Sequence, residues 1–434
     1  MTETFALPSA GDSPWTCPFC PLACDHLGVA VDTTSQTLTL QGGACVRASA
    51  ALAQFNERPS AATPSIDGQP CSLDSALQAA EGLLRASRQP LFGGLGTDVA
   101  GARALYPLAC ATGAICEPLG GAALMHGLRA LQDRGQFTAT LSEVRTRADV
   151  IVFIGGVPAD VAPLIGLRCG IGDAQVPQRR VVVLGPSSGC QALLEAWAGQ
   201  GGVQVEAVPL DGDLFDTVSQ LAVLVSGRSL PAAPPALQQL AATLRGARYG
   251  VLVGSPPRLP ANGALVVEAV HQIVGSLNRS TRAAALWIGG GNGVATANQV
   301  FAWLSGLPLR SRLGPRGLEH EPLLFDAGRL LADGAVDALL WVSSFDATAA
   351  PPANALPMVV LGPPGMASRC LRSDGPTVFI PVTTPGIGSD GHLFRTDGTV
   401  LMPLNRVFSD HLPTVAEVAG RLMAAISQAE RTTA

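Results

Sequence analysis

The feature that most constrains the fold of this chain is a short apolar run that ends in glycine or serine and recurs along its length. The runs are continuously apolar rather than alternating, and helical segments separate them. They occupy residues 89–97, 150–156, 180–185, 250–254, 286–290, 338–343 and 358–362. Strands that are apolar on both faces and alternate with helices form parallel sheets covered on both sides. The sequence therefore predicts an α/β fold with Rossmann-like layers.

Helical apolar spacing fills the stretches between several of these runs. It is clearest in residues 74–87 and 99–112, and it returns in residues 237–247 after a proline-rich segment at 231–235. Near the end of the chain, residues 386–398 form a run of turn residues around two short strand-like pieces. Loops of this kind often wrap a ligand or a partner.

Glycine loops follow several of the predicted strands, at residues 93–96, 155–158, 185–188 and 289–293. Ligands of parallel sheets bind beyond the carboxyl ends of the strands, where glycine lets the backbone approach a phosphate group. Each loop is weak evidence by itself, because glycine after a strand is also ordinary turn chemistry. No complete G-x-G-x-x-G fingerprint follows the first strand, so the sequence does not support a standard NAD site.

Four cysteines near the start form the strongest candidate metal site: Cys17, Cys20, Cys24 and Cys45. The first three follow the spacing Cys-x2-Cys-x3-Cys and the fourth comes from a separate turn, so all four can converge on one centre. The pattern is typical of a [4Fe-4S] cluster; an all-cysteine zinc site and thiols left from a cluster-binding ancestor stay open. A disulfide framework is disfavoured, because residues 1–14 lack the basic start and apolar segment of a secretory signal. We therefore expect a reducing cytoplasm.

Composition excludes several classes of function. The net charge of -5 argues against binding to nucleic acid or to an anionic membrane, and no apolar run reaches membrane-spanning length. Only 14% of the residues are charged, so we expect partner subunits to cover much of the surface. All 28 basic residues are arginine, which excludes a Schiff base, a Walker lysine and a lysine general base.

Several longer strings resemble a known family. They are residues 43–45, 138–150, 291–300 with Trp303 and 306–308, and 388–398. Together with the cysteine module they resemble the molybdopterin oxidoreductases, and more narrowly the B subunit of formylmethanofuran dehydrogenase. That family carries a bis-molybdopterin guanine dinucleotide with tungsten or molybdenum. The resemblance implies a subunit without the C-terminal barrel of larger relatives, which another chain supplies. We expect a cysteine module at 1–55, a Rossmann-like domain formed by 56–118 and 285–434, and a second one inserted at 119–284.

The chain departs from this family at the expected metal ligand. Relatives present a cysteine or selenocysteine followed by His-Gly, whereas this sequence has Met125 before His126 and Gly127. A thioether is neutral and cannot supply the anionic donor that high-valent tungsten or molybdenum takes. Cys116 could substitute if its loop rearranged, but it is also typical of a small buried apolar side chain. His126 and Arg316 match positions that line the family's active site and are predicted here as remnants or partner contacts. His126 is also typical of a hydrogen-bonded histidine at a helix start.

Three functions are compatible with these features. The first is a non-catalytic scaffold subunit of a formyltransferase/hydrolase complex like that of methylotrophic bacteria, in tetrahydromethanopterin-linked oxidation of formaldehyde to formate. The resemblance implies A-, C- and D-type partner subunits that carry the chemistry, and no bis-pterin with tungsten or molybdenum. The second is an active dehydrogenase subunit, which would hold the pterin at Gly155, Gly156, Pro158, Gly291 and Asn292. The third is an iron-sulfur electron carrier or regulator that has lost the pterin.

Overall fold

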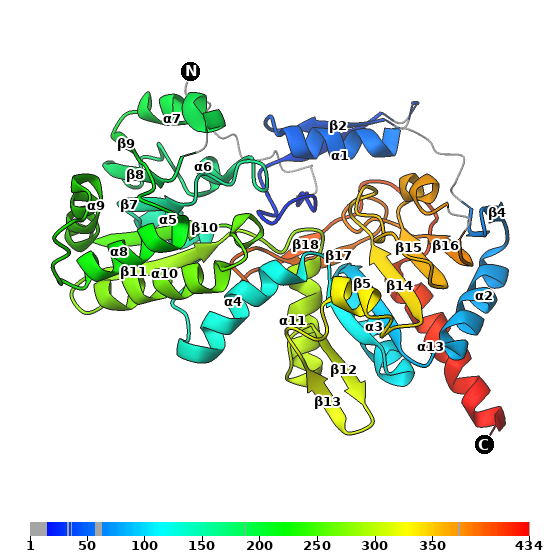
Figure 1. Cartoon of the computed structure of the whole chain (residues 1–434). Helices are drawn as coiled ribbons and strands as arrows, with labels where there is room; N and C mark the ends of the chain where they lie inside the picture. The colour runs from blue at the N-terminus through cyan, green and yellow to red at the C-terminus, as the bar shows by residue number, and fades with distance from the viewer. Residues whose placement is uncertain are drawn as a thin grey trace. The chain divides into compact units, whose positions relative to one another are not determined.

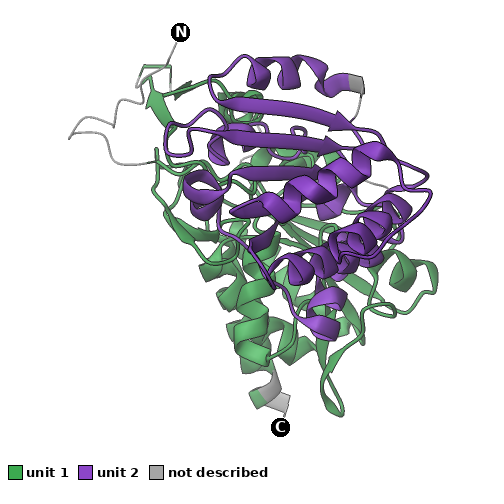
Figure 2. Ribbon diagram, turned by 90° about the vertical axis from the view of Figure 1, so that its left-hand side faces the viewer, with its two compact units in different colours: residues 1–121, 290–434 green, residues 122–289 purple. Residues whose placement is uncertain are grey.

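The computed structural model describes residues 15–32, 34–35, 37–56, 63–186, 188–371 and 374–433 (Figure 1). Residues 1–14, for which the sequence predicts no secretory signal, lie outside the described residues. So does Ser187 of the predicted glycine loop at 185–188. The chain divides into two compact units (Figure 2). Unit 1 contains residues 1–121 and 290–434, and unit 2 contains residues 122–289. Each unit is built on its own sheet.

Unit 1 is organised around a sheet of nine described strands in the order β13-β12-β6-β5-β14-β15-β16-β3-β4. Its centre is parallel: β6 (Ile115–Pro118), β5 (Pro90–Gly96), β14 (Ala338–Ser343), β15 (Met358–Gly362) and β16 (Thr377–Pro381). Antiparallel hairpins extend both ends of the sheet. They are β12 (Ser311–Gly314) with β13 (Gly317–His320), and β3 (Ser65–Ile66) with β4 (Gln69–Pro70).

Capped helices connect the strands of unit 1. The side chains of Ser72 and Asp98 accept hydrogen bonds from the first turns of α2 and α3, and Gly113 ends α3 with a φ of 65°. The N-caps satisfy amides, and the C-cap satisfies carbonyls, that a helix end would otherwise leave without partners. The helical segments of this unit are α1 (Val46–Asn56), α2 (Leu73–Ala86), α3 (Val99–Thr112), α11 (Val294–Ser305), α12 (Ala327–Ala332), η3 (Pro364–Arg369) and α13 (Val415–Thr433).

Two small antiparallel hairpins complete unit 1. One consists of β1 (Gly28–Val31) and β2 (Leu38–Gln41), and α1 packs on its second strand. The other consists of β17 (Gly391–Phe394) and β18 (Leu401–Leu404). Of the two strand-like pieces predicted within residues 386–398, the structure forms one, β17; its partner β18 lies further along the chain.

Unit 2 contains a fully parallel sheet with the described strand order β11-β10-β7-β8-β9. The strands are β7 (Val150–Ile154), β8 (Arg179–Leu184), β9 (Val203–Val208), β10 (Tyr249–Gly254) and β11 (Arg282–Trp287). The helical segments are α4 (Gly121–Arg134), α5 (Leu141–Arg147), α6 (Ile165–Arg168), η1 (Ser188–Cys190), α7 (Gln191–Ala198), α8 (Leu214–Val225), α9 (Pro235–Gly246), η2 (Pro256–Arg258) and α10 (Gly263–Leu277).

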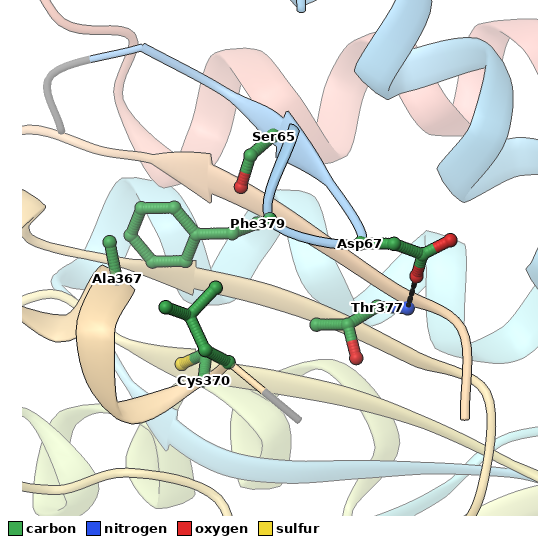
Figure 3. A pocket seen from close by; sticks show the side chains of 8 residues that line it. Ser65, Asp67, Ala367, Cys370, Thr377 and Phe379 are labelled. Carbon is green, nitrogen blue, oxygen red and sulfur yellow. Dashed lines mark hydrogen bonds between the residues drawn. The ribbon is translucent and has the colours of Figure 1, made fainter. Parts of the chain in front are cut away.

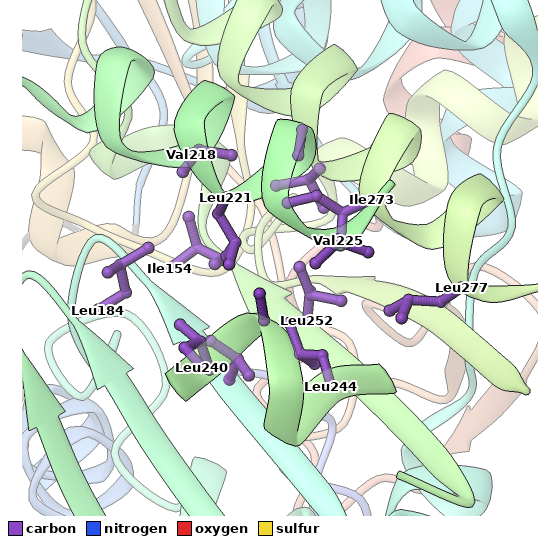
Figure 4. Close-up of a cluster of buried hydrophobic side chains, with 14 of the residues drawn as sticks. Ile154, Leu184, Val218, Leu221, Val225, Leu240, Leu244, Leu252, Ile273 and Leu277 are labelled. Atoms are coloured by element: carbon purple, nitrogen blue, oxygen red, sulfur yellow. The ribbon is translucent and has the colours of Figure 1, made fainter. Parts of the chain in front are cut away.

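The core of unit 2 lies between its sheet and three of its helices (Figure 4). Ile154 and Leu252 come from adjacent strands, while Leu221, Leu240 and Ile273 come from α8, α9 and α10. All five side chains are buried. Burying a side chain of this size stabilises the fold by about 1.5–3 kcal/mol, so this cluster holds the helices against the sheet.

The predicted α/β class with parallel sheets is confirmed by both units. The largest difference in bounds is at one strand: residues 286–290 were predicted, whereas β11 begins at Arg282 and ends at Trp287. Its first half contains Ala283, Ala284 and Ala285, and alanine is depleted in strands, which hid the start. None of the described helices combines the length and apolar character needed to cross a bilayer.

Candidate functional site

The first three cysteines of the module lie on one closed turn in unit 1. The Cys17 amide donates to the Cys24 carbonyl at 2.9 Å, and the Ala23 amide donates to the Cys20 carbonyl at 3.2 Å. Ala23 has a φ of 42°, in the left-handed region that an alanine rarely adopts. Cys45 reaches the same part of the unit from the start of α1. The local backbone is therefore bent to bring cysteines together.

The four side chains are buried thiols. Cys17, Cys20, Cys24 and Cys45 are 2–7% exposed, and all ten cysteines of the chain are thiols. Burial raises the pKa of Cys17, and the neighbouring Cys20 and Cys45 raise it further. A hydrogen bond with Cys24 lowers the pKa of Cys20 to about 7, and Arg47 helps in the same direction. The thiols are thus close enough to influence one another's ionisation.

The donor set suits a metal centre although the side chains are not yet in coordination geometry. Among the residues that the structure describes, no group of three or more His, Cys, Asp or Glu side chains is placed to hold a metal ion. Four cysteine sulfurs are nevertheless the ligands of [4Fe-4S] clusters and of closed zinc sites. Burial, and to a smaller extent the neighbouring thiols, raise the pKa of Cys17, and a bound cation would favour its thiolate form. The residues therefore fit such a group, and its presence stays a prediction.

Hydrogen bonds to backbone carbonyls hold the cysteine turn against the body of unit 1. The Trp15 indole donates to the Gly386 carbonyl at 2.8 Å, and the Thr396 amide donates to the Pro21 carbonyl at 2.9 Å. A side chain at Gly291 would lie 3.3 Å from the Pro21 ring. The structure thus brings together the cysteine turn, one of the predicted cofactor loops and the segment 386–398.

The predicted cofactor loop at residues 289–293 lies beside the ends of β5 and β14. The strand order of unit 1 reverses between these two strands. Gly293 has a φ of 75°, and a Cβ there would lie 2.2 Å from the Thr97 carbonyl oxygen. The Asn292 amide donates to a carboxylate oxygen of Asp346 at 3.3 Å. The Asp98 carboxylate caps α3 nearby. The predicted pterin residues Gly291 and Asn292 therefore lie in a tightly packed loop with carboxylates beside it.

The corresponding loop of unit 2 follows β7. Gly155 and Gly156 have φ values of 73° and 92°, and both amides donate to the Leu184 carbonyl, at 2.9 and 3.2 Å. Pro158 has no amide hydrogen. Because a phosphate cradle is built from amides that have no other partner, these three predicted cofactor residues offer little to an anion in this conformation.

Met125 and His126 lie on α4 of unit 2 and are half-buried. The His126 ring packs against the first residue of α10, because a Cβ at Gly263 would lie 2.8 Å from its Cδ2. Burial lowers the pKa of His126, so the imidazole is neutral near pH 7. An apolar thioether beside a neutral histidine offers no charged donor.

Cys116 and Arg316 both belong to unit 1. Cys116 lies within β6, is 2% exposed and pairs with Phe92 and Ser311 of the neighbouring strands. Burial raises the pKa of its thiol. It could reach a metal only if β6 left the sheet. Arg316 lies in the turn between β12 and β13 with its side chain 90% exposed, 3.8 Å from Glu319.

A small hollow elsewhere in unit 1 has no evident catalytic chemistry (Figure 3). It has room for about one water molecule. The Asp67 carboxylate accepts a hydrogen bond from the Thr377 amide at 2.7 Å and is thereby fixed in a structural role. The residues that line the hollow are Ser65, Asp67, Gly68, Ala367, Cys370, Leu371, Thr377 and Phe379.

Comparison with known proteins decides the family. No protein-family model matches the chain. The B subunit of the formyltransferase/hydrolase complex from Methylorubrum extorquens is 30% identical over 334 residues, which cover 76% of this chain and 87% of that protein. This chain belongs to the family of that B subunit. The predicted resemblance is thereby confirmed.

A solved structure and a second curated relative agree with this family. A chain in the crystal structure of the formyltransferase/hydrolase complex of Methylorubrum extorquens with methylofuran has a TM-score of 0.71 and 28% identity, over 85% of this chain and all of that one. The B subunit of tungsten-containing formylmethanofuran dehydrogenase 2 from Methanocaldococcus jannaschii is 25% identical over 418 residues, covering 88% of this chain and 90% of that protein. The family therefore links a hydrolytic complex with a tungsten enzyme.

Proposed function

We propose that this chain is the B subunit of a formyltransferase/hydrolase complex and serves there as a non-catalytic scaffold. Its pathway would be the tetrahydromethanopterin-linked oxidation of formaldehyde to formate in the cytoplasm. The observation that carries the proposal is Met125, which stands before His126 where dehydrogenase relatives are expected to present an anionic ligand. The identity to the B subunit of the Methylorubrum extorquens complex supports the same choice.

The glycine loops support the absence of a tungsten or molybdenum bis-pterin. In unit 2 the amides of Gly155 and Gly156 are already bonded to Leu184. In unit 1 the Asn292 side chain is bonded to Asp346, whose carboxylate would repel a pyrophosphate. Two amides of the unit 2 loop are thus already used, and a carboxylate lies beside the unit 1 loop, so both loops are less suited to a dinucleotide phosphate. Cys116 does not replace the lost ligand, because it is held inside the sheet.

Partner subunits of A, C and D type would carry the chemistry, with a zinc hydrolase site on A and a formyl-transfer site on D. The structural relative from Methylorubrum extorquens belongs to a complex of four kinds of subunit, FhcABCD. The low proportion of charged residues, 14%, fits a chain whose surface is largely covered by such partners.

The cysteine module would hold a [4Fe-4S] cluster through Cys17, Cys20, Cys24 and Cys45. Bound there, the cluster would tie the N-terminal turn to α1 and could exchange one electron. In a scaffold the first property is the useful one, since metal-binding energy adds directly to folding energy. Zinc bound by the same four thiolates would act in the same structural way.

Met125→Leu in the assembled complex tests the proposal. Leucine matches the volume of methionine and has no sulfur, so formyl transfer and hydrolysis should keep the wild-type rates. The measurement is formate release by the purified complex, with the subunit ratio checked on a gel. A loss of activity of tenfold or more with an intact subunit ratio would place Met125 in the chemistry and contradict the scaffold role.

A further inference from the structure

Arginine is concentrated at one edge of the unit 2 sheet. The segments that lead into or begin β7, β8, β10 and β11 are residues 143–149, 179–180, 245–248 and 279–282. These 17 residues contain eight of the chain's 28 arginines and two carboxylates. Because the strands of this sheet are parallel, their starts lie at one edge, opposite the edge where the predicted cofactor loop follows β7. A chain with a net charge of -5 thus has a locally positive edge.

Four of the eight arginines are held inside the chain. Arg179 is buried, and its guanidinium donates to backbone carbonyls, among them that of Ala148 at 2.9 Å. The partners of the other three are a carboxylate, a hydroxyl and a carbonyl: Asp173 for Arg145, Thr243 for Arg180 and Leu224 for Arg245. These four arginines serve the fold of unit 2 itself.

The other four arginines are exposed and lie along the same edge. They are Arg147, Arg248, Arg279 and Arg282, and we call them the arginine edge. Within the part of the chain that the structure describes, Arg248 alone among them has a carboxylate within salt-bridge distance. Its Nε lies 3.6 Å from Asp149, and its side chain is still 82% exposed. The arginine edge therefore presents its guanidinium groups to the surroundings.

The arginine edge is compact because it lies on adjacent strands. The described order places β11, β10 and β7 side by side, and Arg282 is the register partner of Tyr249, which follows Arg248. The starts of three neighbouring strands span about 10 Å. Burial and Glu143 raise the pKa of Tyr249, whereas Arg282 and Arg147 lower it. Both guanidinium groups therefore lie near the Tyr249 phenol.

The carboxylates of these segments are committed to the backbone. The Asp149 carboxylate accepts hydrogen bonds from two amides at the start of β10, at 3.0 and 2.9 Å, and the Glu143 carboxylate completes the capping box of α5. Arg147 also offsets the dipole at the end of α5, but Arg282 begins a strand, where no helix end explains it. Four guanidinium groups face two carboxylates, so an acidic surface of another chain would balance the excess charge.

We propose that the arginine edge docks on a carboxylate-rich surface of another subunit of the formyltransferase/hydrolase complex, an inference that rests on the proposed role of this chain as a subunit. A guanidinium binds a carboxylate through two parallel hydrogen bonds, and Arg and Tyr are enriched in protein interfaces. A nucleic acid fits less well, because its phosphates beyond this span of about 10 Å would meet a chain whose net charge is -5.

Charge reversal in the assembled complex tests the docking. The complex is produced with the wild-type chain or with Arg147→Glu combined with Arg282→Glu. Gel filtration with light scattering over a dilution series then gives the dissociation constant of the chain. The double reversal should weaken association about tenfold or more at about 50 mM NaCl, and the difference should shrink at about 500 mM, where exposed charges are screened. Arg147→Lys combined with Arg282→Lys keeps the charges and should give an intermediate affinity.

A matched control makes the same charge change elsewhere. Arg88→Glu combined with Arg103→Glu reverses two exposed arginines of unit 1 and should leave association unchanged. Thermal unfolding must show that each variant is folded. As a second measurement, the amides of residues 147–149 and 279–282 should exchange hydrogen more slowly in the complex than in the free chain.

The outcomes separate this surface from the subunit role. Equal association of the double reversal and the wild type, or an equal loss in the control, would overturn the docking surface and leave the subunit role intact. A wild-type chain that joins no other subunit would overturn both. If the wild type binds a DNA duplex or phosphatidylserine vesicles, and the double reversal loses this binding with assembly unchanged, the edge binds phosphate and the proposal is likewise overturned.

Discussion

Replacing Arg310 by methionine is expected to destabilise the protein by about 3–5 kcal/mol, the range for breaking a buried ion pair from one side. The Arg310 side chain is 5% exposed and bonds both oxygens of Glu117, at 2.9 and 2.8 Å. It also bonds Asp326 at 2.6 Å and the Pro322 carbonyl. Methionine keeps much of the volume but leaves the Glu117 carboxylate buried without its cation.

The pH dependence of this loss separates the buried charge from simple packing. Burial raises the pKa of Glu117 to about 7, against the opposing pull of Arg310. A raised carboxyl pKa means that the folded state holds its proton more tightly than the unfolded chain, so stability from this group is lost as pH rises from about 4.5 to 7. Without Arg310 the carboxyl favours its proton still more. The free energy of unfolding that the variant loses relative to the wild type should therefore be smaller at pH 5 than at pH 8.

Urea unfolding at the two pH values measures this effect. Arg85→Met is the matched control, because Arg85 is 47% exposed and pairs with Glu81 within one helix, an interaction worth a few tenths of a kcal/mol. Combining Arg310→Met with Glu117→Gln should recover part of the loss, since no buried charge remains. If Arg310→Met lowers the free energy of unfolding by less than about 1 kcal/mol, or by the same amount at both pH values, the role assigned to the ion pair is contradicted.

Replacing Cys20 by serine is expected to remove the proposed cluster from the N-terminal module and unfold the module locally. A hydroxyl is a poor substitute for a thiolate ligand, and metal-binding energy in small modules is folding energy. Iron and acid-labile sulfide per chain, measured on protein purified without oxygen, should fall from about four of each to well below one. Protease cleavage within residues 15–56 should become faster in parallel.

The control for this variant is Cys71→Ser, which changes a half-exposed cysteine outside the module and should leave the iron content unchanged. One zinc per wild-type chain in place of iron would identify the other four-thiolate centre. Wild-type protein without either metal, together with equal protease resistance of Cys20→Ser, would show that the four thiols serve no metal.

The main strands could be predicted because their physical signal is local. Residues 338–343 and 358–362 are apolar on both faces, and they match β14 and β15 residue for residue. The edge strands could not be predicted, since β3, β4 and the hairpin β12–β13 have no such run. Helix α3 was predicted with its correct bounds, because its apolar spacing coincides with a clear cap at Asp98.

The candidate site was less predictable because its chemistry depends on distant contacts. The spacing of Cys17, Cys20 and Cys24 pointed to their common turn. Nothing local indicated that the amides of Gly155 and Gly156 would be bonded to Leu184, or that Asn292 would meet Asp346. Arg310 and Glu117 are 193 residues apart, and their pairing arises only from the sheet. Asp346 could have been predicted as a site residue, because it follows the carboxyl end of β14 and ligands of parallel sheets bind beyond such strand ends.

The central claim is that this member of the family supports other subunits and carries no tungsten or molybdenum chemistry of its own. The most direct measurement is elemental analysis of the purified complex for tungsten and molybdenum, with oxidative extraction of any pterin from the same sample. The scaffold role predicts both metals far below one per chain and no fluorescent pterin derivative. One tungsten or molybdenum per chain, with about two pterins released, would contradict it.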